Sequence, residues 1–251
     1  MKYFIGFVFP ILFCSKFIYP KNSGMMRKSE ILRLLTILYF IIALVEITAE
    51  YFLYQPALFV LKPLIPTTLL LLYWMESKKK NFAFLLAILF STITNILFIP
   101  NTDNCLFYGI ISFAIFRILS IYIVFKLQNI KDYIPLFIAT APFLLIFSYL
   151  FTETTDIPEN SVFIIVFQNI MISIFAGVSL SSYIMNDNKQ NSILFISALL
   201  FVMLQFVVFI EKYFLTNEYQ QLFRPLAMTF NVFAFYSFYR YVINAEESNN
   251  N

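Results

Sequence analysis

The chain has 251 residues, of which 61% are hydrophobic, 20% aromatic and only 12% charged, with a formal net charge of +3. Soluble domains are about half apolar and a quarter charged, so this composition excludes an ordinary soluble protein. The basic residues form short clusters between apolar runs, which excludes a nucleic-acid footprint, and we expect no nucleic-acid partner. Histidine is absent and the only cysteines are Cys14 and Cys105. Serine-histidine and cysteine-histidine catalysis are thereby excluded, and we expect no metal and no cofactor.

Residues 1–24 form a segment distinct from the rest. The stretch "MKYFIGFVFPILFCSKFIYP" begins with a basic residue and is apolar, but Pro10 and Lys16 interrupt it and no small-residue cleavage site follows. It is therefore a poor signal peptide. Two alternatives stay open, a marginal additional helix or an N-terminal extension upstream of a true start at Met25 or Met26, and we favour the second.

Eight apolar runs follow in chain order, separated by polar turns or turns that contain Pro or Asn. A helix needs about 17 to 25 apolar residues to cross a bilayer, and each run approaches or reaches this length. The sequence predicts an all-α, polytopic integral membrane bundle over residues 25–243, with a disordered, solvated tail at 244–251. The expected helices cover residues 31–49, 57–75, 82–100, 105–126, 132–151, 160–184, 191–214 and 222–243.

Basic residues alternate with these runs in a way that predicts the orientation. "KKK" at 78–80 follows the second run, whereas the acidic "TETTDIPEN" at 152–160 follows the fifth. By the positive-inside rule both termini are cytoplasmic. The high content of Asn, Lys, Ile and Phe is typical of an AT-rich bacterial genome, so we expect a bacterial inner membrane protein. The basic residues on the cytoplasmic side are Arg27, Lys28, Arg33, Lys78, Lys79, Lys80, Lys126, Lys131, Lys189 and Arg240.

Polar residues inside the predicted helices lie mainly in the outer half. Such residues are costly in a membrane and usually face the bundle interior or a water-filled cavity. Two interpretations stay open: the polar faces converge on one pocket for a membrane lipid, or each side chain only bonds a neighbouring helix. The candidate substrate-binding residues are Lys62, Asn95, Arg117, Asn169, Gln205 and Asn231.

Arg117 interrupts the apolar stretch "FYGIISFAIFRILSIYIVF" at 107–125. A guanidinium group cannot shed its charge, and its planar donors suit a carboxylate or a phosphate. Glu46 and Glu50, four residues apart at the outer end of the first predicted helix, are the natural protein partners. A lipid phosphate is the natural ligand, and the sequence leaves both alternatives open.

Five apolar segments carry a family resemblance. They are "LKPLIPTTLLLL" (61–72), "ILFSTITNILFIP" (88–100), "LFYGIISFAIFRILSIY" (106–122), "SALLFVMLQFVVFIEKYF" (197–214) and "MTFNVFAFYSF" (228–238). Their order resembles the YhhN-like, or lysoplasmalogenase, family of eight-helix membrane proteins over residues 31–243.

The chain resembles a divergent member of that family, because its acidic and histidine motif positions are replaced. The family's Gly-Asp position holds Thr94 and Asn95, and its histidine position holds Arg117. Its Ser-Asp position holds Leu204 and Gln205. The glutamine of the family's last helix falls near Ala234.

The resemblance implies hydrolysis of the vinyl-ether bond of a lysoplasmalogen to a fatty aldehyde and a glycerophospho-headgroup. This chemistry needs a general acid, and Glu46 and Glu50 are the candidate catalytic residues inside the bundle. The expected partner is a membrane lipid, a lysophospholipid in particular. Two alternatives remain: a non-catalytic lipid-binding protein with the same fold, and, less favoured, a small transporter. Symmetric halves with broken helices, which are typical of transporters, are missing from the sequence.

Overall fold

The computed structural model describes residues 23–100, 102–128, 133–154, 159–215 and 219–248. The expectations for residues 1–22 and for 249–251 lie outside the described residues. The chain divides into two compact units, residues 1–34 and 35–251. The described part of the first unit is a helical segment, and the second unit is the bundle analysed below.

The described residues form eight α-helices and no strand, which confirms the predicted all-α fold. All eight expected helices are present. Their bounds are α2 Ser23–Tyr51, α3 Gln55–Glu76, α4 Phe82–Leu97, α5 Asp103–Leu127, α6 Ile134–Thr152, α7 Glu159–Met185, α8 Lys189–Tyr213 and α9 Gln220–Ser248.

Six of these helices are long and apolar enough to cross a membrane, namely α2, α3, α5, α6, α7 and α8. Helix α4 has 16 residues, so it is about 24 Å long, somewhat shorter than the roughly 30 Å hydrocarbon core. Helix α9 is long but carries polar residues along its length, and its buried residues extend from Ala227 to Glu246. These features indicate an integral membrane protein in which α9 packs inside the bundle.

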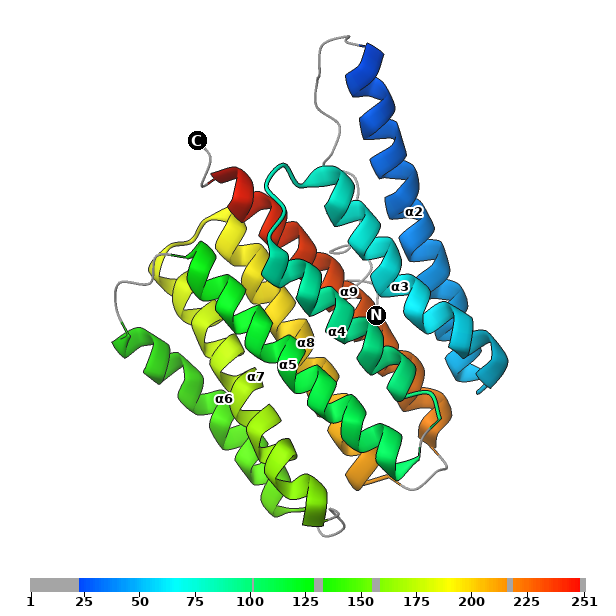
Figure 1. Ribbon diagram of the computed structural model, residues 1–251. Helices are drawn as coiled ribbons and strands as arrows, with labels where there is room; N and C mark the ends of the chain where they lie inside the picture. Colours follow the sequence, from blue (N-terminus) through cyan, green and yellow to red (C-terminus); the bar gives the residue numbers. More distant parts are fainter. Residues whose placement is uncertain (1–22, 101, 129–132, 155–158, 216–218, 249–251) are drawn as a thin grey trace, which may run out of the picture. The chain divides into compact units, whose positions relative to one another are not determined.

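Neighbouring helices of the bundle pack along their lengths (Figure 1). Helix α5 packs between α4 and α7, and α8 packs against both α7 and α9. Helix α3 contacts α4 and α9, while α6 contacts α7. Helix α2 also reaches α9, where the Tyr39 hydroxyl donates a hydrogen bond to the Val232 carbonyl oxygen at 2.9 Å.

An aromatic cluster forms the centre of the bundle. The Phe201 ring lies 5.2 Å from Phe235, 5.7 Å from Phe116 and 5.9 Å from Phe175, measured between ring centroids. These rings come from α5, α7, α8 and α9, and each side chain is almost fully buried. The cluster joins four helices by dispersion and edge-to-face contacts.

Helices α6 and α7 approach each other closely at Gly177. A Cβ atom on Gly177 would lie 2.8 Å from the Cα of Thr140 and would also overlap its Oγ1. Small residues at helix contacts allow this backbone approach in membrane proteins. Since α6 packs mainly against α7 in the described bundle, the close approach at Gly177 contributes to holding α6 in place.

We expect Gly177→Ala to destabilise the protein by about 1–3 kcal/mol, because the added Cβ atom meets backbone that cannot yield. The measurement is the thermal unfolding midpoint in detergent. Gly109→Ala is the matched control, because its Cβ would meet mainly the ring edge of Phe98, which can rotate. An unfolding midpoint that falls equally in both variants would contradict the assigned role of Gly177.

The bundle has two ends, which we name by one lysine each. The Lys62 end contains the turns after α2, α4 and α8, and the Lys78 end contains the turns after α3 and α7 together with the end of α9. The expectation that a solvated tail begins at residue 244 is wrong for 244–248. Helix α9 continues to Ser248, and Ala245 and Glu246 are buried, because Glu246 finds hydrogen-bond partners on α3 and the turn that follows it.

The predicted orientation can be tested by cysteine labelling in intact cells. We expect Thr102→Cys, at the Lys62 end, to react with a membrane-impermeant maleimide, whereas Lys79→Cys reacts only after the membrane is opened. Cys14→Ser and Cys105→Ser remove the native thiols. Labelling of both positions from the same side would contradict the predicted topology.

Candidate functional site

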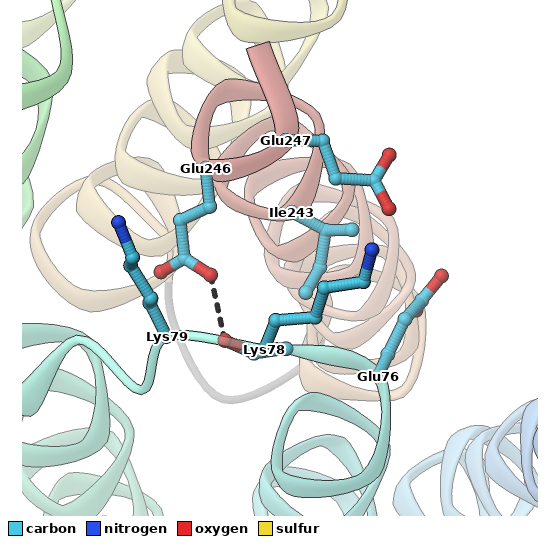
Figure 2. Close-up of a pocket in the computed structure, with 7 residues that line it drawn as sticks. Glu76, Lys78, Lys79, Ile243, Glu246 and Glu247 are labelled. Atoms are coloured by element: carbon cyan, nitrogen blue, oxygen red, sulfur yellow. Dashed lines mark hydrogen bonds between the residues drawn. The ribbon is translucent and has the colours of Figure 1, made fainter. Parts of the chain in front are cut away.

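The Lys78 end is held together by paired polar groups. The hydroxyl of Tyr73 donates to Glu246 Oε1 at 2.6 Å, and Ser77 Oγ donates to Oε2 at 2.7 Å. In Figure 2 the dashed line that ends on Glu246 marks the hydrogen bond from Ser77, and Glu246 helps to line a small hollow of about 170 Å³. Burial raises the pKa of Glu246, while its hydrogen bonds from Tyr73 and Ser77 act in the opposite direction.

Further contacts close the same end. Glu76 accepts hydrogen bonds from the Tyr239 hydroxyl and from Arg240, the latter at 3.0 Å. Gln128 joins the α7 and α8 ends, since it donates to Asn191 at 2.9 Å and accepts from Ser182. The polar side chains here bond one another across helices, which favours a structural role for this end.

The half of the bundle toward the Lys62 end differs, because several of its buried polar atoms lack hydrogen-bond partners. Within the described ranges, the buried side-chain atoms without a hydrogen-bond partner are both carboxylate oxygens of Glu46, Oε2 of Glu50, all three guanidinium nitrogens of Arg117, Oε1 of Gln168, Oδ1 of Asn169 and the Tyr241 hydroxyl. The sequence had indicated Glu46, Glu50, Arg117 and Asn169 as candidates, whereas Tyr241 lies at the Lys78 end, beside Gln128 and Gln190. Buried polar groups are nearly always satisfied, so such a concentration indicates a site for water or a ligand.

Two carboxyl groups of α2 lie in different surroundings one helical turn apart. Oε1 of Glu50 forms an ion pair with Lys62 Nζ at 2.5 Å. Glu46 is fully buried and its two oxygens are unpaired, although Lys62 and Glu50 are close enough to act on its charge. A carboxyl group without a partner in apolar surroundings is favoured as the neutral acid, whereas a lysine partner favours the carboxylate.

Proline shapes the position of Asn95. Pro66 lies inside α3 and has no N–H group, so the carbonyl oxygen of Lys62, one turn earlier, lacks its helical donor. Asn95 Nδ2 of α4 lies 3.5 Å from this carbonyl oxygen. The sequence-predicted residues Lys62 and Asn95 therefore lie together, and the side chain of Lys62 pairs with Glu50.

Arg117 lies in an aromatic environment and has no carboxylate partner among the described residues. Its side chain is fully buried, and Cζ lies 4.6 Å from the ring centroids of both Phe113 and Phe201. Phe113 precedes Arg117 by one turn, so the side chain points toward the start of α5, at the Lys62 end. Glu50 pairs with Lys62 instead, and the expected carboxylate alternative for Arg117 is absent.

Two other candidate residues lie next to the aromatic cluster at the centre of the bundle. Gln205 follows Phe201 by one helical turn on α8, and Asn231 precedes Phe235 by one turn on α9, so both lie on the Lys62 side of the rings. Gln168 donates to the Ile110 carbonyl oxygen at 2.8 Å, next to the buried Asn169. The structure thus brings Lys62 together with Glu50 and Asn95, one turn from Glu46, and surrounds Arg117 with aromatic rings.

Charged residues that sequence analysis did not assign to the site also reach the Lys62 end. Arg224 pairs with Glu211 Oε1 at 3.1 Å. Lys212 lies near Glu211, Arg224, Lys62 and Glu50, all of which act on its charge. The signal that could have found them is the charged pair "EK" at the end of the apolar run of α8.

An apolar groove borders the same end. It encloses about 510 Å³, is open on one side, and lies between the end of α2 and the start of α3. Its lining residues are Val45, Thr48, Ala49, Phe52, Tyr54 and Ala57. Leu53, in the turn between these helices, has a positive φ of 52°, which costs a non-glycine residue about 1 kcal/mol and fixes a tight turn.

Comparison with known proteins gives one match. A model of the YhhN family matches residues 57–243. This segment contains Lys62, Asn95, Arg117, Gln205 and Asn231, whereas Glu46 and Glu50 precede it. No curated protein and no solved structure matches the chain.

Proposed function

The chain belongs to the YhhN family of membrane proteins, and from this premise we propose that it hydrolyses the vinyl-ether bond of a lysoplasmalogen-type lipid. The observation that carries the proposal is Glu46, a buried carboxyl group with two unpaired oxygens beside the paired Glu50. Two neighbouring carboxyl groups in contrasting surroundings are the arrangement that general acid and general base catalysis requires. The activity itself is the one that the family resemblance implies.

In the proposed reaction Glu46 donates its proton to the vinyl carbon remote from the ether oxygen, which gives an oxocarbenium ion. Water adds to the carbon bound to oxygen, and the carboxylate of Glu50, which contacts Lys62, accepts a proton from that water. The hemiacetal then loses its hydroxyl proton to Glu46, while the departing glycerol oxygen takes the proton from Glu50. One water is consumed, and both carboxyl groups return to their starting states.

A second candidate, lipid binding without cleavage, is favoured by Arg117. Its unpaired guanidinium suits an anionic ligand, and a positive charge near the reacting bond would disfavour the cationic oxocarbenium. Asn95 and Gln205, which stand where the family offers acidic residues, cannot transfer protons but can bond a ligand. In this alternative the polar groups around Arg117, including Asn169 and Asn231, hold a lysophospholipid.

The experiment incubates detergent-purified protein with a 1-alkenyl lysophospholipid and, separately, with the 1-acyl analogue. Hydrolysis is supported if mass spectrometry detects fatty aldehyde from the alkenyl lipid and no fatty acid from the acyl lipid. Retained binding of both lipids without aldehyde would favour the second candidate. If the protein neither binds nor cleaves either lipid, both candidate functions are contradicted.

A further inference from the structure

Arg117 on α5 and Gln168 on α7 present complementary unpaired atoms inside the bundle. Both side chains are buried, and the two residues are 0% and 2% exposed. Among the described residues, the three guanidinium nitrogens of Arg117 and Oε1 of Gln168 have no hydrogen-bond partner. The nitrogens can only donate a hydrogen bond and Oε1 can only accept one. A ligand that carries both an acceptor and a donor would serve both residues, whereas an anion without a donor would leave Gln168 unsatisfied.

The amide group of Gln168 is held in a defined orientation. Its Nε2 donates to the carbonyl oxygen of Ile110 on α5 at 2.8 Å. Because a carbonyl oxygen can only accept, this contact requires the nitrogen of the amide to face the α5 backbone. Oε1 is therefore the atom of Gln168 that is left for a ligand, and that ligand must supply a donor.

Both side chains reach the same turn of α5. Ile110 and Arg117 are seven residues apart and share one face of that helix. The Ile110 carbonyl oxygen points toward the C-terminal end of α5, to about the level of Phe113. Arg117 Cζ lies 4.6 Å from the Phe113 ring centroid, so the guanidinium reaches back to that level. The Gln168 amide and the guanidinium therefore lie at similar depth on one face of α5.

The contacts of α7 lead to the same arrangement. Gln168 and Phe175 are seven residues apart and share one face of α7. The Phe175 ring lies 5.9 Å from the Phe201 ring, and Phe201 lies 4.6 Å from Arg117 Cζ. The faces of the Phe113 and Phe201 rings attract the guanidinium charge but supply no oxygen for its N–H groups. These N–H donors and Oε1 of Gln168 thus remain available to one ligand.

We propose that Arg117 and Gln168 form one subsite that recognises the phosphate and the neighbouring free hydroxyl group of a lysophospholipid. Arg117 donates to the phosphate oxygens, and Oε1 of Gln168 accepts from the sn-2 hydroxyl, which lies on the carbon next to the one that carries the phosphate ester. Gln168 is then a specificity-determining residue, because a lipid without this hydroxyl leaves Oε1 buried and unpaired. This inference rests on the lipid ligand of the proposed function and is independent of the cleavage step. Inorganic phosphate also combines anionic oxygens with a hydroxyl, so the test includes it.

The test measures binding of three probes, none of which the proposed reaction can cleave, to the full-length protein in detergent. They are a saturated 1-O-alkyl lysophospholipid, its 2-deoxy analogue, in which hydrogen replaces the sn-2 hydroxyl, and the 1-O-alkylglycerol, which lacks phosphate. We expect the wild type to bind the lysophospholipid about fivefold more tightly than the 2-deoxy analogue. Gln168→Met should remove this hydroxyl preference, because the methionine side chain has a similar length but its sulfur accepts hydrogen bonds only weakly. Gln55→Met, at the exposed start of α3, is the matched control and should retain the preference.

Arg117→Met tests the phosphate contact. Loss of the charged hydrogen bonds should weaken binding of both phospholipids by about tenfold or more and leave binding of the alkylglycerol unchanged. The hydroxyl preference and the phosphate preference are each a ratio of two affinities measured on one variant. They therefore do not depend on how much of that variant is folded. Inorganic phosphate is added as a competitor to the wild type.

The outcomes separate the possibilities. Loss of the hydroxyl preference in Gln168→Met but not in Gln55→Met, together with loss of the phosphate preference in Arg117→Met, supports the subsite. Either preference unchanged in its variant would overturn the subsite, and aldehyde release by the wild type would then leave the proposed function intact. Competition by inorganic phosphate as strong as that by the lysophospholipid would assign the subsite to the free anion and overturn the lipid assignment. If the wild type binds none of the lipids and releases no aldehyde, the proposed function fails together with this inference.

Discussion

Glu46→Gln is expected to reduce vinyl-ether cleavage by about 10²–10⁴-fold, because glutamine keeps the shape of the side chain but cannot donate a proton to carbon. Glu46 is fully buried without a hydrogen-bond partner, so a neutral amide in its place should leave the fold close to the wild type. The measurement is aldehyde release under single-turnover conditions together with the thermal unfolding midpoint. The expected combination is a lost rate with retained stability.

Glu46→Asp and Glu50→Gln complete the test. Aspartate keeps the acid but withdraws it by one methylene group, so a partial loss of rate is expected. Glu50→Gln removes the carboxylate that pairs with Lys62 at 2.5 Å, so it should lower stability as well as rate, because the lysine is left buried and unpaired. Full activity in Glu46→Gln would show that another group supplies the proton.

Arg117→Met is expected to raise the thermal unfolding midpoint of the ligand-free protein by roughly 2–10 °C, which corresponds to about 1–4 kcal/mol. The guanidinium is fully buried and its three nitrogens lack hydrogen-bond partners. Its contacts with the rings of Phe113 and Phe201 return about 2 kcal/mol each, less than the cost of an uncompensated buried charge. A stable variant that binds lipid more weakly would show that Arg117 is kept for function.

Arg224→Met is the matched control and should change stability in the opposite direction. It removes the partner of Glu211, whose side chain is only 7% exposed, and leaves a buried carboxylate unpaired at a cost of about 1–3 kcal/mol. The two variants compare Arg117, which has no carboxylate partner among the described residues, with Arg224, which pairs with Glu211. A fall of the midpoint in both would mean that Arg117 has a bound partner in the folded protein.

A double variant tests whether Arg117 and Glu46 are coupled. Because Glu50 pairs with Lys62 and Arg117 lies against aromatic rings, the effects of Arg117→Met and Glu46→Gln should add within about 0.5 kcal/mol. Strong rescue of one change by the other would indicate a direct ion pair between them.

The sequence by itself determined the eight helices and their approximate bounds. The length of each apolar run determines these bounds, because a chain segment in the bilayer must satisfy its backbone N–H and C=O groups within its own helix. It also indicated where unpaired polar groups would gather, because depth along a helix can be counted from its ends. Glu46 and Arg117 were both singled out in this way, and both lack hydrogen-bond partners among the described residues.

Only the tertiary structure decided which charges meet. The sequence indicated Glu50 as a candidate partner of Arg117 and gave no reason to pair Glu50 with Lys62. Which helices are neighbours, and how each is rotated, depends on the packing of the whole bundle. The rings of Phe113 and Phe116 from α5 and of Phe201 from α8 surround Arg117, so its environment is built by two helices that are distant in the sequence. Glu246 looked like part of a solvated tail for the same reason: its partners Tyr73 and Ser77 lie 173 and 169 residues away along the chain, and only packing brings them together.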